Sequence, residues 1–273
     1  MPMATTHCGS LLARHIPFSS GLRMQSTNLV KKIAIEGNIG AGKSTFLSIL
    51  QSNFNFRAVP EPIADWQNVA SEEAGKPTEN LLDLFYKDPK RWAYTFQTYA
   101  CLTRVRSQLA PPPADLMQLS NPVLFYERSV YSDRYCFMDN CYKSGLINEM
   151  EWRLYCDWHT HLLGALGGLH IDGIVYLRVK PEVCMERLKH RNRSEESTVG
   201  LDYLSSIHEQ HEKWLMRKET KISPVLKNVP VFVLESDQEF QTDHDRQVEM
   251  VGELKDFLAN CSSTEVPADV AAR

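Results

Sequence analysis

Residues 31–52 read KKIAIEGNIGAGKSTFLSILQS, and this stretch decides the fold class. Its centre, from Gly37 to Ser44, has the form G-x-x-x-x-G-K-S, with a short apolar run before it and an amphipathic run after it. The glycines of such a loop let backbone N–H groups turn inward around phosphate oxygens, and the N-terminus of the following helix adds partial positive charge. The stretch therefore predicts a strand, a phosphate-binding loop and a helix. The alternative, a chance glycine-rich turn, does not explain the flanking pattern.

The phosphate-binding loop supplies a positive charge and a metal ligand. Lys43 is predicted to reach the transferred phosphate, and the Ser44 hydroxyl is predicted to hold Mg²⁺. The loop residues predicted to bind the nucleotide are Gly37, Asn38, Ile39, Gly40, Ala41, Gly42, Lys43, Ser44 and Thr45. The loop alone predicts no particular reaction, because GTPases, motor ATPases and small-molecule kinases share it. The D-x-x-G and N-K-x-D signatures of a GTPase do not occur in the sequence.

Strand and helix patterns alternate along the rest of the chain. Runs rich in β-branched and aromatic residues, at 123–126, 173–179 and 229–234, predict strands buried on both faces, and residues 56–60 are predicted to form a further strand. The intervening stretches predicted to be helical are about 79–109, 129–144, 148–166, 181–192, 200–218 and 240–259. Such alternation predicts an α/β fold, with a five-stranded parallel sheet flanked by helices in one domain over residues 31–260.

Composition excludes several functional classes. The 273 residues carry a net charge of −4, which gives no overall basic field for nucleic acid. No apolar run reaches the length of about 18 residues that a transmembrane helix needs, so no membrane is expected as a partner. The 7 cysteines include no C-x-x-C pair, which argues against a disulfide framework and a zinc site. His208 and His211 lack the H-E-x-x-H spacing of a zinc-binding helix and are expected on a helix surface.

Both ends of the chain are predicted to be flexible tails. Residues 1–30 contain arginine and serine but no acidic residue, which is typical of a mitochondrial transit peptide. The alternative is an ordinary flexible tail on a cytoplasmic or nuclear protein. Residues 261–273 have no hydrophobic periodicity and are expected to form a loose tail.

Polar residues follow the predicted second and third strands, at the sheet edge where ligands bind in such folds. Glu61, between Pro60 and Pro62, is predicted to be the general base for an acceptor hydroxyl. Glu127 is predicted to bind Mg²⁺ or its water, and Arg128 is predicted to hold the acceptor. The alternatives are a solvated loop glutamate for Glu61 and an ordinary ion pair at the strand end for the other two.

Three arginines follow the predicted fourth strand. Arg187 and Arg191 are four residues apart and share a helix face, and Arg193 lies just beyond them. Guanidinium groups in such a cluster suit a mobile lid that neutralises the transferred phosphate and helps to exclude water. The alternative is a solvated charged face, and the phosphate-binding loop in the same chain favours the lid.

Longer stretches of the sequence resemble a known family. These stretches are IEGNIGAGKST (35–45), VPEPIADWQNV (59–69), RWAYTFQTYACL (91–102), PVLFYERSVYSDRY (122–135), EWRLYCDWH (151–159), GIVYLRVKPEVC (173–184) and the arginine-rich segment. They resemble the vertebrate deoxyribonucleoside kinases of the deoxycytidine kinase and deoxyguanosine kinase group, over about residues 30–260. The resemblance implies a P-loop kinase fold with an arginine-rich lid.

The resemblance also implies a reaction. The γ-phosphate of ATP or UTP would pass to the 5′-hydroxyl of deoxycytidine, deoxyguanosine or deoxyadenosine, with Mg²⁺ as cofactor, in nucleotide salvage. A homodimer formed through long helices is implied as well. Two alternatives stay open: a nucleoside monophosphate kinase of the thymidylate kinase type, which needs a site for the acceptor's phosphate, and a catalytically silent nucleotide-binding regulator. The second would have changed Glu61, Arg128 or the lid, and all are intact.

Roles for the acceptor site follow from the resemblance, position by position. Glu61 would be the base for the 5′-hydroxyl, with Arg128 holding both in place, and Tyr86 and Glu196 would bind the sugar 3′-hydroxyl. The residues implied around the base are Gln97 as a bidentate hydrogen-bond partner, Arg104 and Asp133 as a charged pair, Phe96 and Phe137 as stacking rings, and Trp66, Ile39 and Phe85 as apolar walls. The charged pair is similar to that of the family members that phosphorylate cytosine and purine nucleosides, rather than that of the thymidine-preferring branch. For the single aromatics, an ordinary core position remains the alternative.

Overall fold

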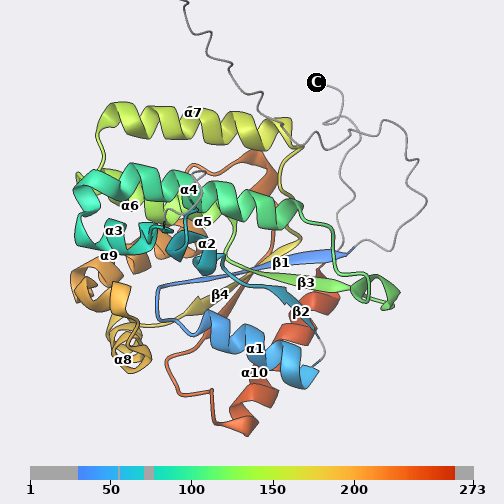
Figure 1. The fold of residues 1–273 in the computed structure, drawn as a ribbon. Coiled ribbons are helices and arrows are strands. Elements are labelled where there is room, and N and C mark those ends of the chain that lie inside the picture. The colour runs from blue at the N-terminus through green and yellow to red at the C-terminus, as the bar shows by residue number, and fades with distance from the viewer. Residues whose placement is uncertain (1–29, 55, 71–76, 262–273) are drawn as a thin grey trace, which may run out of the picture.

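The computed structural model describes residues 30–54, 56–70 and 77–261, and its centre is one twisted parallel sheet (Figure 1). The strands are β1 (Lys31–Gly37), β2 (Arg57–Val59), β3 (Val123–Glu127), β4 (Gly173–Arg178) and β5 (Val231–Glu235). They lie in the order β2-β3-β1-β4-β5, and all neighbouring pairs are parallel. The predicted five-stranded parallel sheet is confirmed. The predicted tails lie outside the described residues, except for Val30 and Cys261 at their inner ends.

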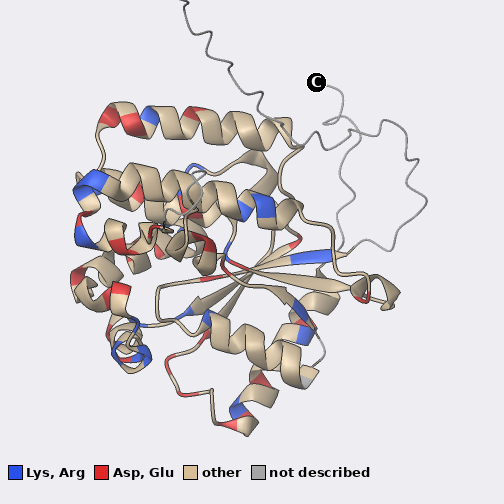
Figure 2. Ribbon diagram, in the orientation of Figure 1, with Lys and Arg blue, Asp and Glu red and all other residues tan. Residues whose placement is uncertain are grey.

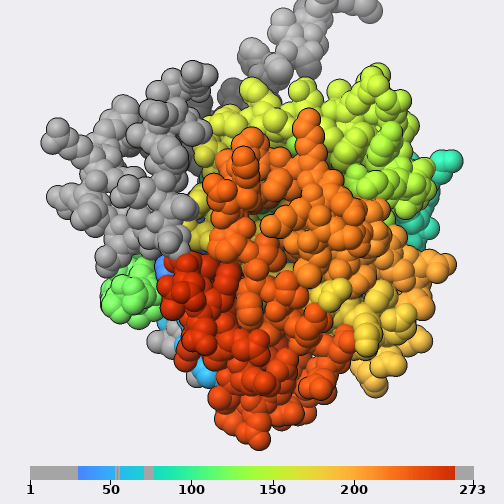
Figure 3. Space-filling view, turned by 180° about the vertical axis from the view of Figure 1, so that it is seen from behind, coloured from blue at the N-terminus to red at the C-terminus, as the bar shows by residue number. Residues whose placement is uncertain are grey.

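Helices cover both faces of the sheet. They are α1 (Lys43–Phe54), α2 (Ile63–Gln67), α3 (Leu81–Lys87), α4 (Pro89–Leu109), α5 (Val130–Ser132), α6 (Asp139–Lys143), α7 (Glu149–Ala165), α8 (Pro181–Arg191), α9 (Leu201–His211) and α10 (His244–Asn260). Figure 1 shows α4 and α7 on one side of the sheet and α1 and α10 on the other. Seen from behind, much of the surface belongs to the chain that follows α9 and ends in α10 (Figure 3).

The apolar strands are continuous because each face of the sheet packs against its own core. In β1, Ile33 and Ile35 are fully buried in the cluster that contains α1 and α10 residues. Ala34, between them, is fully buried in the cluster on the side of α4 and α7. Alternate side chains of a strand point to opposite faces, so a strand buried on both sides reads as an unbroken apolar run.

The predicted helix over 79–109 is two helices, and the break has a local cause. Asp88 ends α3, and its carboxylate accepts a hydrogen bond at 3.2 Å from the backbone N–H of Arg91 in the first turn of α4. Pro89 follows and has no N–H to continue α3. The break lets α3 fold back on α4, so that Phe85 stacks on Phe96 with ring centroids 4.7 Å apart. The interruption therefore builds one wall of a pocket.

His211 is buried, and its expected place on a helix surface is wrong. The residue has no solvent exposure, its ring stacks on Tyr176 at 5.8 Å, and its Nδ1–H donates to the carbonyl of Ile207 at 2.8 Å. Burial lowers its pKa to about 3, so the ring is neutral. After His211, α9 passes into a wider π-helical turn, Glu212–Met216, which continues the helix and buries Trp214.

The described residues also bear on the chemistry of the cysteines and on membranes. Cys101, Cys136, Cys141, Cys156, Cys184 and Cys261 are all free thiols. Over the same part of the chain, no helix combines the length and the apolar character that a membrane span requires.

Candidate active site

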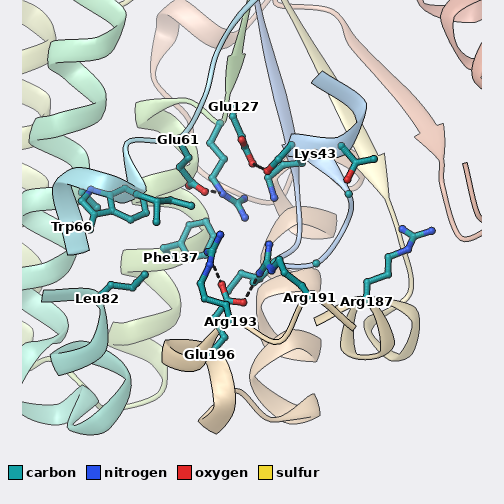
Figure 4. A pocket seen from close by; sticks show the side chains of 18 of the residues that line it. Lys43, Glu61, Trp66, Leu82, Glu127, Phe137, Arg187, Arg191, Arg193 and Glu196 are labelled. Carbon is teal, nitrogen blue, oxygen red and sulfur yellow. Dashed lines mark hydrogen bonds and ion pairs between the residues drawn. The ribbon is translucent and has the colours of Figure 1, made fainter. Parts of the chain in front are cut away.

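A cavity of about 660 Å³ opens where β1, β2 and β3 end (Figure 4). It is lined by the loop after β1, by residues that follow β2 and β3, by α3 and α4, and by the end of α8. Ligands of doubly wound sheets bind at this carboxyl edge, near the strand where the order of connections reverses. Here the chain leads from β1 to β2 on one side of the sheet and from β3 to β4 on the other, so the reversal falls between the neighbouring strands β1 and β3.

The phosphate-binding loop has the geometry that its glycines predict. Gly40 has φ +77°, and a Cβ atom there would lie 2.5 Å from the carbonyl oxygen of Cys184, so only glycine fits. Lys43 is 5% exposed, and its Nζ donates to the carbonyl of Asn38 at 2.8 Å. Burial, reinforced by the nearby Arg128, lowers the pKa of Lys43 to about 8.

A hydroxyl and a carboxylate meet at the inner end of the loop. The Ser44 Oγ donates to Glu127 Oε1 at 2.8 Å, as the dashed line in Figure 4 marks. Oxygen ligands of this kind suit Mg²⁺, which usually takes its remaining ligands from phosphate oxygens and water. The predicted pair therefore fits the metal.

Glu61 faces the cavity between two arginines. Its Oε1 lies 2.9 Å from Arg104 Nη2 and 3.0 Å from Arg128 Nε. Burial opposes ionisation of this carboxyl, but the two arginines outweigh it and lower the pKa of Glu61 to about 2. Glu61 is therefore a fixed carboxylate at neutral pH and not a solvated loop residue.

Arg128 is held in an uncommon backbone conformation. Its φ is +66°, in the left-handed region that non-glycine residues rarely adopt. Its N–H donates to the carbonyl of Ile35 at 2.9 Å, and its Nη1 donates to the carbonyl of Gly37 at 2.6 Å. Its guanidinium also lies 4.6 Å from the centre of the Phe137 ring. These contacts lock the side chain that orients Glu61.

Glu36 supports the same corner of the site, although it is not among the residues predicted from the sequence. Its carboxylate is fully buried, and Oε1 accepts from the Ser129 N–H at 2.9 Å and from its Oγ at 2.6 Å. Burial raises the pKa of Glu36 to about 6. The available signal was an acidic residue at the end of an otherwise apolar strand, directly before the phosphate-binding loop.

Aromatic rings form the acceptor end of the cavity. Phe96 stacks on Phe85, and the Trp66 ring meets Phe96 edge-on with centroids 5.4 Å apart. Trp66 is fixed by a hydrogen bond from its Nε1 to Thr103 Oγ1 at 2.9 Å. Gln97, only 2% exposed on α4, lines the same space. The predicted rings and apolar walls, Phe96, Phe137, Trp66, Ile39 and Phe85, all line the cavity.

Arg104 does more than the resemblance implied. Its Nε donates to Asp133 Oδ2 at 2.8 Å, as expected for the predicted pair. Its other nitrogens donate to Glu61 Oε1 and to the carbonyl of Glu127, both at 2.9 Å. Arg104 thus connects Asp133, on the side of the pocket predicted to hold the nucleobase, with Glu61, the predicted general base.

The three arginines predicted to form a lid separate into two groups. Arg191 and Arg193 both bind Glu196, the latter pair at 2.9 Å between Nη1 and Oε1. Arg187 instead donates to the carbonyl of Ser236 at 2.8 Å, and in Figure 4 it points away from the other two. Basic residues gather in the last turn of α8 (Figure 2), where Arg191 lies, whereas Arg187 lies one turn earlier.

Further cavity residues were not predicted from the sequence as site residues. They include Ala100, Tyr203, His190, Glu239, Phe240 and Gln241. Phe240 packs against the phosphate-binding loop, since a Cβ on Gly42 would lie 2.7 Å from its ring, and Arg187 lies 5.5 Å from the ring centre. These contacts join residues far apart in sequence, and no local pattern predicts them.

Comparison with known proteins identifies the family. A family model described as "Deoxynucleoside kinase" matches residues 33–259. The chain belongs to the deoxynucleoside kinase family. It is therefore an enzyme, a kinase that acts on deoxynucleosides.

Similar proteins include kinases named for different bases. Deoxycytidine kinase 2 of Gallus gallus is 46% identical over 242 residues, which cover 85% of this chain and 91% of the relative. Deoxycytidine kinase of Homo sapiens is 44% identical over 241 residues, covering 84% and 92%. The mitochondrial deoxyguanosine kinase of Xenopus laevis is 41% identical over 250 residues, covering 88% and 94%. The choice of base therefore has to be argued from the pocket of this kinase.

Proposed function

We propose that the kinase transfers the γ-phosphate of ATP or UTP to the 5′-hydroxyl of deoxycytidine, deoxyguanosine or deoxyadenosine, in nucleotide salvage. The observation that carries the proposal is the Glu61 carboxylate, which two arginines hold in the same cavity as Lys43 of the phosphate-binding loop. A base and a phosphate-binding group in one cavity are the two parts that such a transfer needs.

The residues divide the work along the cavity. The oxygen of the 5′-hydroxyl attacks the γ-phosphorus, and Glu61 accepts the proton that this hydroxyl loses. Arg128 orients Glu61. Lys43, with Arg191 and Arg193, neutralises charge on the transferred phosphoryl group. Ser44 and Glu127 would hold Mg²⁺, and the metal would stabilise the negative charge of the phosphate groups.

The contacts of the arginines favour an unphosphorylated acceptor. A nucleoside monophosphate kinase needs cationic groups for the acceptor's phosphate. Near Glu61, however, Arg104 is paired with Glu61 and Asp133, and Arg128 is bound to Glu61 and the Gly37 carbonyl. These arginines are already paired with carboxylates of the site, so they are not available to bind a phosphate group of the acceptor. Glu61 can then face an unphosphorylated hydroxyl.

The Arg104–Asp133 pair supports cytosine or purine over thymine, and a double variant tests this. Both side chains are at least 96% buried, so a thymine 5-methyl group would meet a polar wall. Replacing them together, Arg104→Met with Asp133→Ala, removes both charges and opens apolar space. The thymidine-to-deoxycytidine ratio of kcat/KM should rise at least about tenfold.

The ratio is the correct measurement, because Arg104 also binds Glu61 and its loss lowers kcat for every acceptor. Each single variant leaves one charge of the pair without its partner and should shift the ratio less than the double variant does. An unchanged ratio in the double variant would show that this pair does not select the base.

A homodimer through α4 and α7 is supported by their outer faces. Large apolar side chains are exposed on both helices, including Leu109 at 50%, Leu154 at 52% and Met150 at 63%. Large apolar side chains exposed on two long helices would be buried if these helices met a second copy of the chain. The two helices lie side by side on one flank of the molecule (Figure 1).

Mitochondrial import is proposed from residues 1–30, which lie almost wholly outside the described part of the chain. Their content of arginine and serine without acid supports it, and a deoxyguanosine kinase among the relatives is named mitochondrial. Fused to a fluorescent protein, these residues should direct it to mitochondria, and the kinase without them should stay in the cytoplasm or nucleus. A diffuse signal from the fusion would overturn the proposal.

A further inference from the structure

Two consecutive glutamates in the segment Ser194–Thr198 bind partners on different elements. Glu196 binds Arg191, the last residue of α8, and Arg193, which lies two residues beyond the helix. Two guanidinium groups against one carboxylate leave a net positive charge toward the phosphate side of the cavity. Glu195 makes no ion pair with these arginines among the contacts of the described residues, and its carboxylate turns to the acceptor side.

Glu195 is almost enclosed and accepts several hydrogen bonds. It is 8% exposed, and its Oε1 accepts from Gln67 Nε2 at 2.7 Å and from Asn80 Nδ2 at 2.9 Å. Its Oε2 accepts from Ser194 Oγ at 3.0 Å. The hydrogen bond from Asn80 contributes most to lowering the pKa of Glu195 to about 2, so the group is a carboxylate at neutral pH.

The two amide partners belong to the helices that form the acceptor pocket. Gln67 ends α2, next to Trp66 of the aromatic wall. Asn80 caps α3, with its Oδ1 accepting from the Asp83 N–H at 2.9 Å, and α3 carries Tyr86. Glu195 therefore joins the segment to both helices at once.

A further contact holds the other end of the segment. The Thr198 Oγ1 donates to the carbonyl of Tyr86 at 3.3 Å. The Tyr86 hydroxyl lies close enough to Glu196 for that carboxylate to raise its pKa, in addition to the larger effect of burial. Tyr86 and Glu196 thus sit together only while the segment stays against α3.

We propose that Glu195 is a positioning residue that clamps Ser194–Thr198 against α2 and α3, and so sets Glu196 between the acceptor sugar and the two arginines. The inference rests on the proposed binding of the sugar 3′-hydroxyl by Glu196. It adds that the acceptor pocket and the phosphate-binding arginines are connected through two neighbouring carboxylates. Loss of the clamp weakens recognition of the 3′-hydroxyl without removing any group that touches it.

The test compares acceptors that differ only at the 3′ position. The kcat/KM of the best deoxynucleoside is divided by that of its 2′,3′-dideoxy counterpart, which lacks the 3′-hydroxyl. The intact kinase should favour the hydroxyl at least about tenfold, and Glu196→Ala should abolish this preference. Glu195→Ala should reduce it at least about threefold, because Glu196 loses its fixed position.

Two milder variants keep the test valid if Glu195→Ala does not fold. Glu195→Gln retains an oxygen that accepts from both amides and should restore most of the preference. Gln67→Ala removes one donor and leaves the Asn80 cap in place, so it should lower the preference less than Glu195→Ala does. Glu186→Ala, at an exposed position on α8, is the matched control and should leave the preference unchanged.

The outcomes separate the inference from the proposal beneath it. If Glu195→Ala and Gln67→Ala lower kcat/KM equally for the deoxynucleoside and its dideoxy counterpart, the ratio stays at its original value. Glu195 then has only a structural role, which overturns the inference. If Glu196→Ala leaves the ratio unchanged, the proposed 3′-hydroxyl site is wrong and the inference falls with it. A reduced ratio in Glu195→Ala and Gln67→Ala, restored in Glu195→Gln, supports both.

Discussion

Replacing Glu61 with Gln should lower kcat by about 10²- to 10⁴-fold and leave the KM for the nucleoside nearly unchanged. The amide keeps the size of the side chain, and its oxygen still accepts hydrogen bonds from Arg104 and Arg128. What it loses is the ability to take the proton of the attacking hydroxyl. Steady-state kinetics at saturating donor measure the effect, with Glu186→Gln on the exposed face of α8 as the control.

The pH profile gives a second check on Glu61. Because its pKa is about 2, the carboxylate is ionised from pH 5 to 8, and protonation of Glu61 should not reduce kcat in that range. The Gln variant should therefore be slow by the same factor at every pH in the range. An unchanged kcat would refute the role of Glu61 as the base.

Replacing Lys43 with Ala should reduce activity by about 10³-fold or more while the fold survives. The Nζ is held at 2.8 Å from the Asn38 carbonyl, inside the loop that is predicted to wrap the phosphates. Its removal takes away the charge that stabilises the transferred phosphoryl group. The ammonium is buried, and within the described residues it donates its hydrogen bond to this same loop, so its loss should not unfold the domain.

Circular dichroism and thermal unfolding of Lys43→Ala should match the parent, which separates loss of chemistry from loss of structure. Lys43→Met, which keeps the aliphatic stem, should be as inactive as the Ala variant. A purified Lys43→Ala kinase that phosphorylates deoxynucleosides at the normal rate would contradict the assignment of the loop.

Local patterns predicted the parts of the site that lie within one stretch of chain. The loop from Gly37 to Ser44 has its spacing, its strand and its helix written into one segment, and the structure reproduces all three. The same holds for the strand ends at Glu61 and Glu127, because parallel strands bring their carboxyl ends to one edge. The break between α3 and α4 is also local. The pair Asp88-Pro89 signals it, although the helical pattern continues across the pair.

Contacts between distant segments could not be read from the sequence in this way. Arg104 of α4 binds Glu61, which lies 43 residues earlier in the chain, whereas the resemblance placed Arg104 only beside the nucleobase. Arg187 and Arg191 share a helical pattern, yet the loop after β5 draws Arg187 away through the Ser236 carbonyl. Glu195 is adjacent to a predicted site residue, but its partners lie more than 100 residues earlier in the chain, at separations of 128 and 115.

Incubating the purified kinase with γ-labelled ATP, Mg²⁺ and a series of acceptors tests the central claim most directly. The account predicts labelled 5′-monophosphates from deoxycytidine, deoxyguanosine or deoxyadenosine, and no labelled product from a 5′-deoxy analogue that lacks the attacking hydroxyl. Label appearing in diphosphates from deoxynucleoside monophosphates, with none transferred to the nucleosides themselves, would contradict it.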